Sequence, residues 1–310
     1  MKLSNILTKI TLAVISCLLL FLPNTITAQS SEPPLKVTVT TSFLADMVQQ
    51  ITDGTVELTQ LIAAGSDPHT YSPQARDLEA ILEADLIIYH GLRFEAQIAE
   101  ILEDYGHSVT QTFDPADLIK VSDNSAEVDP HYWFNLDLYQ QSVSEAQVIL
   151  TEAAPELTAV FAANTEAYLK ELEALAVWTD EQLAPLPIEE RILVTPHDAF
   201  SYFAQQNGFV VYAPQGISTE SEVSNEQIVR TVEFIVDHQV PAIFLDTTSN
   251  PQAMQKLQEG VQQQGAEVKM VSGENQELFS DSLAPQGQPY DTYIEMYRHN
   301  VSLIVEYLTR

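Results

Sequence analysis

The chain has 310 residues, of which 13 are basic and 44 are acidic, so its formal net charge at pH 7 is −31. Such a charge repels nucleic acid and anionic lipid, and we therefore exclude nucleic-acid binding; it attracts cations only weakly over the whole surface. Apolar residues make up 45% of the chain, enough to bury one large domain or two of ordinary size.

Residues 1–28 are expected to be a secretory signal peptide. Lys2 and Lys9 precede an apolar run at 10–23, and the segment Thr-Ile-Thr-Ala ends at Ala28, a small residue suited to the cleavage site. The run is too short for a membrane-spanning helix of about 20 residues, so we expect an exported, periplasmic protein. As an alternative, Cys17 resembles the acylated cysteine of a membrane-anchored lipoprotein, although six further residues of the run follow it. Cys17 is the only cysteine, so cleavage after Ala28 leaves no thiolate ligand and no disulfide.

The first half of the remaining chain alternates between strands and helices. Ser72-Pro73 suggests a helix N-cap followed by proline at the first helical position, and Gly106 ends a later helix. Strand patterns occupy residues 35–42, 56–64 and 85–89, and helical patterns occupy residues 43–51, 74–84 and 95–106. From 136 to 183 the pattern is helical throughout, with one expected break at Pro155.

The alternation resumes in the second half. Ser224 and Gln227 form a capping-box pattern ahead of an amphipathic helix. Strands are expected at 191–195, 209–214, 241–247 and 266–271, and helices at 197–208, 224–239, 250–265 and 290–308. Strands separated by such helices predict two α/β lobes with mainly parallel sheets. We place the N-terminal lobe at 29–150, the linking helix at 151–188 and the C-terminal lobe at 189–310.

Three of the seven histidines directly follow a proline near the end of an expected strand: His69, His131 and His197. Proline stiffens the corner on which each histidine sits, and ligands of open α/β sheets bind beyond the carboxyl ends of strands. One such histidine is more often an ordinary turn residue, but three suggest a metal site. A zinc site without cysteine has to be completed by histidine and carboxylate.

Several segments together resemble a known family. "DPHTYSPQARDLEAILEADLIIYHGLRFE", "DPHYWF", "LVTPHDAFSYFAQQNGFVVYAPQGISTESEVS", "PAIFLDTTSNPQAMQKL" and "ELFSDSLAPQGQPYDTYIEMYRHNVSLIVEYL" look like the solute-binding proteins of zinc/manganese/iron ABC transporters, the TroA-like group. The resemblance runs from about Val37 to the C-terminus. It implies two α/β lobes joined by one long rigid helix, with the metal in the cleft between them. It places the ligands at His69, His131, His197 and, in "LFSDSL", at Asp281, which the sequence alone does not single out.

The resemblance implies high-affinity capture of a divalent transition metal outside the cytoplasm and delivery to the membrane permease of an ABC importer. We expect a monomer and favour zinc (Zn²⁺), because three imidazoles and one carboxylate suit zinc, while hard oxygen ligands suit manganese. Manganese (Mn²⁺) stays an alternative, since members with this histidine set are associated with both metals. A manganese- or iron-specific carrier of the same family is the runner-up.

Two other classes of protein are less consistent with the sequence. A mono-zinc hydrolase needs an open coordination position and a general base, and Asp281 would close that position; no His-Glu-x-x-His motif occurs. We therefore expect no enzyme. Adhesion is a third possibility, because some members were first described as adhesins, but no receptor-binding feature is visible.

The other polar candidates are given lesser roles. We expect His90 to support the site rather than to bind the metal, and His107, His238 and His299 to be solvated. Glu220 and Glu222 are expected to cover a loop rather than to orient the ligands, and Trp133 and Phe134 to pack beside the site.

Overall fold

The computed structural model describes residues 33–121 and 127–309. The signal peptide predicted at 1–28 and the alternative lipidation site at Cys17 lie outside the described residues. Pro34–Arg310 forms one compact unit. Within the described part of the chain, no helix has both the length and the apolar character needed to cross a bilayer.

The first half contains a four-stranded parallel sheet with the strand order β2-β1-β3-β4. Val37, Val39 and Ile88 on the two central strands are fully buried, which explains the apolar pattern of these segments. The elements are β1 (Lys36–Val39), α2 (Ser42–Thr52), β2 (Glu57–Gln60), α3 (Ala75–Glu83), β3 (Leu86–Tyr89), a 3₁₀ turn (Ala96–Ile98), α4 (Ala99–Tyr105) and β4 (His107–Ser108).

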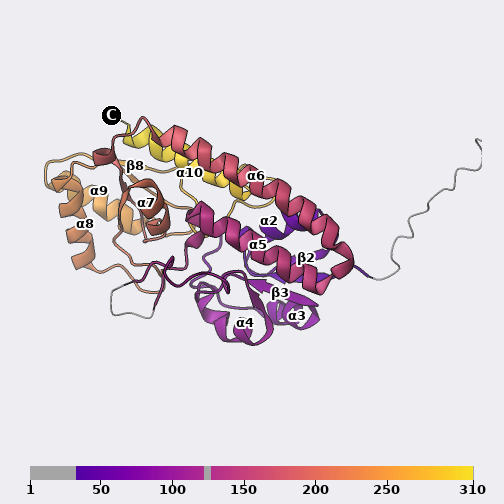
Figure 1. Ribbon diagram of the computed structural model, residues 1–310. Helices are drawn as coiled ribbons and strands as arrows, with labels where there is room; N and C mark the ends of the chain where they lie inside the picture. The colour runs from indigo at the N-terminus through magenta and orange to yellow at the C-terminus, as the bar shows by residue number, and fades with distance from the viewer. Residues whose placement is uncertain (1–32, 122–126, 310) are drawn as a thin grey trace, which may run out of the picture. The chain divides into compact units, whose positions relative to one another are not determined.

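Two consecutive helices follow the sheet. A 3₁₀ turn (Tyr132–Phe134) leads into α5 (Leu136–Ala153), whose N-cap Asn135 accepts from the backbone N–H groups of Asp137 and Leu138. A second 3₁₀ turn at Pro155–Leu157 separates α5 from α6 (Thr158–Leu183), which confirms the break expected at Pro155. The 26 residues of α6 span about 39 Å. This long helix packs against α2, α5 and α10 (Tyr293–Leu308) and so connects both halves of the chain (Figure 1).

The second half is again α/β, with parallel strand pairs β5-β6 and β7-β8. β5 also contacts β7. Gly208 closes α7 in the left-handed conformation with φ 70°, which glycine adopts without strain. The elements are a 3₁₀ turn (Ile188–Glu190), β5 (Ile192–Val194), α7 (Ser201–Asn207), β6 (Val210–Tyr212), α8 (Asn225–Asp237), β7 (Ala242–Phe244), α9 (Gln252–Gln263), β8 (Lys269–Val271) and α10.

The main hydrophobic core draws side chains from both halves, from Val37 on β1 to Ile304 on α10. A separate cluster lies in the second half, where Val232 of α8 packs with Leu257 of α9 and Ile243 of β7. The predicted α/β class with parallel sheets and a long helix is confirmed. The lobe boundaries predicted at 150 and 188 stay a prediction.

Two local predictions are wrong. Helix α3 begins at Ala75 with Gln74 as its N-cap, not at Pro73, because the Asp77 carboxylate accepts from the Gln74 backbone N–H at 2.6 Å. The helix expected from residue 197 begins only at Ser201, so His197 lies in the loop before it. This shift leaves His197 at the end of β5, where its backbone can pair with Gln215.

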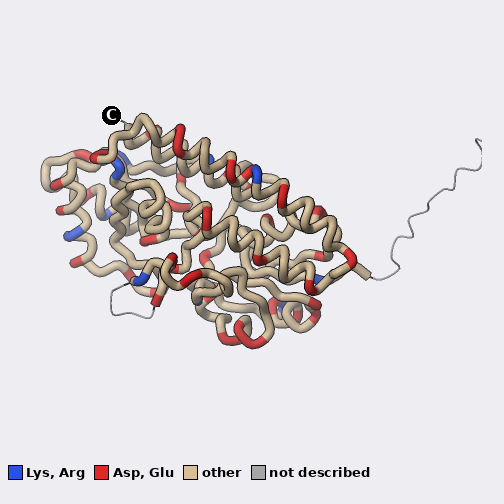
Figure 2. Tube along the Cα trace, viewed as in Figure 1, with Lys and Arg blue, Asp and Glu red and all other residues tan. Residues whose placement is uncertain are grey.

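Acidic residues are distributed along the helices and loops of both halves, with few basic residues among them (Figure 2). Two of the basic side chains form exposed ion pairs within single helices, Lys170 with Glu166 and Arg230 with Glu226. Exposed pairs of this kind add little to stability.

Candidate metal centre

His69 lies in the loop between β2 and α3, on the corner formed by Asp67 and Pro68. The Asp67 carboxylate fixes this corner, because its Oδ1 accepts from the His69 backbone N–H at 2.9 Å and its Oδ2 from the Thr70 hydroxyl at 2.9 Å. The His69 side chain is buried, and its Nε2 lies 3.3 Å from Nε2 of His131.

His131 follows the second Asp-Pro pair and immediately precedes the turn Tyr132–Phe134. Its backbone N–H and its ring Nδ1 both lie within hydrogen-bond distance of Asp129 Oδ1, at 2.9 and 2.7 Å. This contact assigns the ring proton to Nδ1 and turns Nε2 toward Asp281 Oδ1, 3.3 Å away.

His197 follows β5 and is also oriented by a carboxylate. Its ring Nδ1 lies 3.2 Å from Oδ2 of Asp246, and its Nε2 lies 3.1 Å from Oδ2 of Asp281. Asp246 lies two residues after the end of the buried strand β7 and is itself 3% exposed. The sequence prediction missed Asp246, although an acid at the end of a buried strand is a signal of the same kind as the three histidines.

Asp281 lies in the loop between β8 and α10 and is fully buried. Residues of the first half hold its loop in place: the indole N–H of Trp133 donates to the Ser280 carbonyl at 3.0 Å, and the Leu283 backbone N–H donates to the Ser42 hydroxyl at 2.9 Å. Ser42 Oγ also lies 3.1 Å from Ser282 Oγ. The carboxylate is therefore fixed by contacts that span about 240 residues of chain.

The four predicted side chains converge. One ligand atom from each of His69, His131, His197 and Asp281 lies within 4.8 Å of every other, and all four residues are buried. Their atoms are separated by 3.3 Å (His69–His131), 3.3 Å (His131–Asp281), 3.1 Å (His197–Asp281) and 4.0 Å (His69–Asp281). Ligand atoms about 2.0–2.1 Å from a tetrahedral ion lie about 3.4 Å apart, so the spacing fits such an ion.

The hydrogen bonding of the cluster also indicates a site for a cation. Among the described residues, His197 Nε2 and Asp281 Oδ1 are buried polar atoms that make no hydrogen bond, and their close contacts, Asp281 Oδ2 at 3.1 Å and His131 Nε2 at 3.3 Å, are ionic contacts inside the cluster. A buried polar atom without a partner costs free energy. A cation bound between the rings and the carboxylate would satisfy both atoms.

The electrostatics couple the four groups. Burial lowers the pKa of His69 to about 3. Burial would also lower the pKa of His131, but the carboxylates of Asp129 and Asp281 outweigh it and raise this pKa to about 9. Burial opposes the charged forms of His197 and Asp281 too, yet their attraction raises the pKa of His197 and lowers the pKa of Asp281. A metal ion that enters the cluster must therefore displace protons.

His90 is fully buried beside the cluster and does not belong to it. Its Nε2 lies 2.7 Å from the Thr41 hydroxyl and its Nδ1 lies 2.9 Å from the Tyr132 hydroxyl. Trp133 packs against the rings of both His90 and His131, with centroid distances of 5.2 and 5.3 Å.

The remaining histidines lie away from the cluster. His107 and His238 are exposed, as predicted. The prediction is wrong for His299, which is only 9% exposed and places Nε2 2.9 Å from the Glu277 carbonyl, because α10 turns this residue toward the loop before it. Glu220 and Glu222 are exposed in the loop before α8.

Comparison with known proteins agrees with the geometry. The family described as "Zinc-uptake complex component A periplasmic" (ZnuA) matches residues 37–307. The zinc-binding protein TroA of Treponema pallidum (strain Nichols) is 35% identical over 288 residues, covering 91% of each chain. The manganese-binding lipoprotein MntA of Bacillus subtilis (strain 168) is 30% identical over 285 residues, covering 90% of this chain and 92% of its own.

A solved TroA structure, determined to study metal-binding specificity, has the same fold with a TM-score of 0.87 and 47% identity, covering 89% of this chain and 100% of its own. The resemblance noted in the sequence is thus confirmed over nearly the whole described chain. Members of the family take part in metal uptake as solute-binding proteins and are not enzymes, so the hydrolase alternative falls. The chain belongs to the ZnuA family of periplasmic metal-binding proteins.

Proposed function

We propose that this protein captures one divalent transition metal ion per chain, bound by Nε2 of the three histidines His69, His131 and His197 and by the carboxylate of Asp281. The observation that carries the proposal is the buried convergence of these atoms, with His197 Nε2 and Asp281 Oδ1 left without hydrogen bonds. Four ligands leave no position for a catalytic water, which fits a carrier.

Zinc is the proposed cargo. Neutral imidazole suits zinc, and an N/O site binds zinc more strongly than manganese by the Irving–Williams order. Asp129 and Asp246 would hold the His131 and His197 rings with Nε2 free for the metal, as outer hydrogen bonds do at zinc sites.

Manganese is the second candidate. The support for it is the 30% identity to a manganese-binding lipoprotein, which is close to the 35% identity to the zinc-binding TroA. A carboxylate ligand is acceptable to both metals.

The protein would act outside the cytoplasm and deliver its ion to the membrane permease of an ABC importer, most simply as a monomer. The support is the family description, which names a periplasmic component of an uptake complex. Export by cleavage after residue 28 and anchoring through Cys17 are alternatives for how it is held there.

Competitive titration of the metal-free protein with zinc and manganese tests the proposal, with the bound metal counted by elemental analysis. We expect one zinc per chain with a nanomolar or tighter dissociation constant, and much weaker manganese binding. His197→Ala should abolish tight binding, while His107→Ala, an exposed histidine, should bind like the wild type. Comparable affinity for both metals would favour the second candidate, and no tight site for either metal would refute the four-ligand proposal.

A further inference from the structure

Residues 216–220, here named the strap, lie between two cavities beside the metal centre. One cavity of about 500 Å³ is lined by Asp67, Pro196 and Thr219 among others. The other, of about 650 Å³, is lined by His69, Ile217 and Glu220 among others. The strap therefore separates two openings, each of which reaches a histidine ligand or the residue next to one.

At its start the strap is joined to the loop of His197. Gln215, just before the strap, pairs with His197 in a parallel bridge and donates its backbone N–H to the Pro196 carbonyl at 3.3 Å. The Asp198 backbone N–H donates to the Gly216 carbonyl at 3.2 Å. These bonds tie the start of the strap to the backbone around His197.

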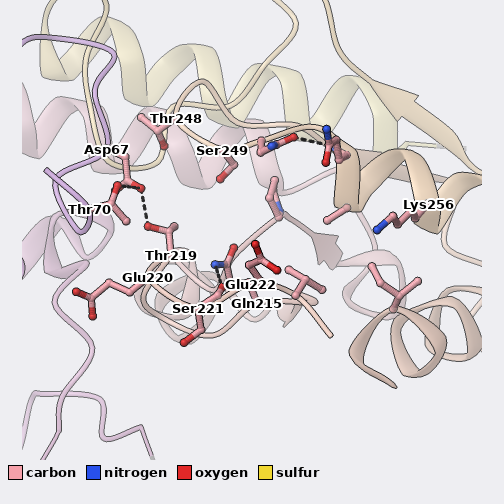
Figure 3. Close-up of a pocket in the computed structure, with 16 residues that line it drawn as sticks. Asp67, Thr70, Gln215, Thr219, Glu220, Ser221, Glu222, Thr248, Ser249 and Lys256 are labelled. Atoms are coloured by element: carbon pink, nitrogen blue, oxygen red, sulfur yellow. Dashed lines mark hydrogen bonds between the residues drawn. The ribbon is translucent and has the colours of Figure 1, made fainter. Parts of the chain in front are cut away.

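Further along, the strap is joined to the loop of His69 in the other half of the chain. The Thr219 hydroxyl donates to Asp67 Oδ2 at 2.5 Å across 152 residues of sequence (Figure 3). The other oxygen of the same carboxylate accepts from the His69 backbone N–H. An exposed hydrogen bond from Gln97 to Glu220, 2.9 Å long, adds a second contact with the first half.

The Thr219–Asp67 bond is the stronger of the two contacts on physical grounds. Both bonds end on a carboxylate and are therefore charge-assisted, but the Thr219–Asp67 bond is the shorter of the two, at 2.5 Å against 2.9 Å. Thr219 is partly buried, whereas Gln97 and Glu220 are exposed to competing water.

We propose that the Thr219–Asp67 hydrogen bond is a latch that slows metal dissociation by holding the loops of His69 and His197 together. Thr219 touches no metal and acts through Asp67, so it is a positioning residue. This inference rests on the proposed metal-carrying function. When the latch opens, the strap can move away from the His69 corner without breaking the fold of either half.

The test measures the rate at which zinc dissociates from the zinc-loaded protein, without residues 1–28, into an excess of a chromogenic chelator by stopped flow. Thr219→Val keeps the shape of the side chain and removes the hydroxyl, and we expect zinc to dissociate roughly tenfold faster. Thr219→Ser keeps the hydroxyl and should restore the rate to within about twofold of the wild type.

Ser221→Ala is the matched control. This variant removes a hydroxyl that lies two residues after Thr219 and has no hydrogen-bond partner among the described residues. Zinc should dissociate from it at the same rate as from the wild type. If Thr219 served only the folding of the loop, Thr219→Val would lower the melting temperature and leave the dissociation rate unchanged, which would overturn the latch. The failure of the proposed function is a separate result, in which the wild type itself binds no zinc tightly.

Discussion

Two copies of the tripeptide Asp-Pro-His use their aspartates differently. Asp129 contacts the ring Nδ1 of His131, whereas Asp67 accepts from the backbone of His69 and from Thr219 of the strap. Of the three histidines, His131 and His197 are oriented through their rings by carboxylates, Asp129 and Asp246. His69 is fixed through its backbone corner.

The role of Asp129 leads to a prediction for metal affinity. Asp129→Asn keeps an acceptor oxygen near Nδ1 but removes the charge, so the His131 ring becomes a weaker ligand. We expect the zinc dissociation constant to rise about 10- to 100-fold, as for other residues that support metal ligands. Competition against a chelator of known affinity measures it. Asp104→Asn changes the net charge equally at an exposed position and should leave the affinity unchanged; equal affinities for the two variants would contradict the role of Asp129.

The buried ring of His90 makes the stability of the metal-free protein depend on pH. Burial lowers the pKa of His90 to about 3 from its ordinary 6.5, so the folded protein keeps this ring neutral while the unfolded chain takes up a proton. Its contribution to stability is complete above pH 6.5 and falls as the pH drops toward 3. Between pH 6.5 and 5 it should remove about 2 kcal/mol from the free energy of unfolding.

Urea unfolding of wild type and His90→Asn across this pH range isolates the effect. The variant will be less stable at pH 7, because it loses the contacts to Thr41 and Tyr132, but its free energy of unfolding should fall by about 2 kcal/mol less on acidification. His69 and the buried acids titrate in both proteins and cancel in the comparison. Parallel pH profiles would show that His90 does not titrate as described.

At the level of elements, the sequence predicts what local forces determine. Helix α8 was predicted with its capping box, and Ser224 and Gln227 do exchange both hydrogen bonds. β1 and β3 were predicted from their buried apolar residues. The two-residue strand β4 was missed, because its only basis is pairing with β3, which leaves no periodic pattern in the sequence.

The metal site shows the same difference between features that the local sequence determines and features that depend on distant contacts. The Pro-His corners mark His69, His131 and His197 in the sequence, because the proline and the strand end are local features. Nothing local marks Asp281 among 44 acidic residues; its position depends on Trp133 and Ser42, which lie far away in the chain and hold its loop. Only the family resemblance supplied it. The hydrogen bond between Thr219 of the strap and Asp67 likewise could not be predicted from the sequence, because it joins residues that are far apart in the chain.

At the level of the whole molecule, a net charge of −31 surrounds a buried site for a cation. Acidic residues are spread over both halves (Figure 2), and their charges create a negative potential that extends into the solvent. This potential raises the local concentration of cations and so speeds their encounter with the protein. It cannot hold the ion once bound, because the buried ligands do that at short range.

The charge therefore predicts a salt effect on one rate only. Raising the ionic strength from 0.01 to 1 M shortens the screening length from about 30 to 3 Å, so the association rate of zinc should fall roughly tenfold. The dissociation rate should change less than about twofold, because the four ligands are buried from the ions. Stopped-flow measurement of tryptophan fluorescence can follow both rates, because the Trp133 ring lies 5.3 Å from the His131 ring. Potassium nitrate is a suitable salt, because nitrate binds zinc weakly. An association rate that does not change with salt would mean that the surface charge plays no part in capture, while a dissociation rate that rises with salt would place an exposed ionic contact among those that hold the metal.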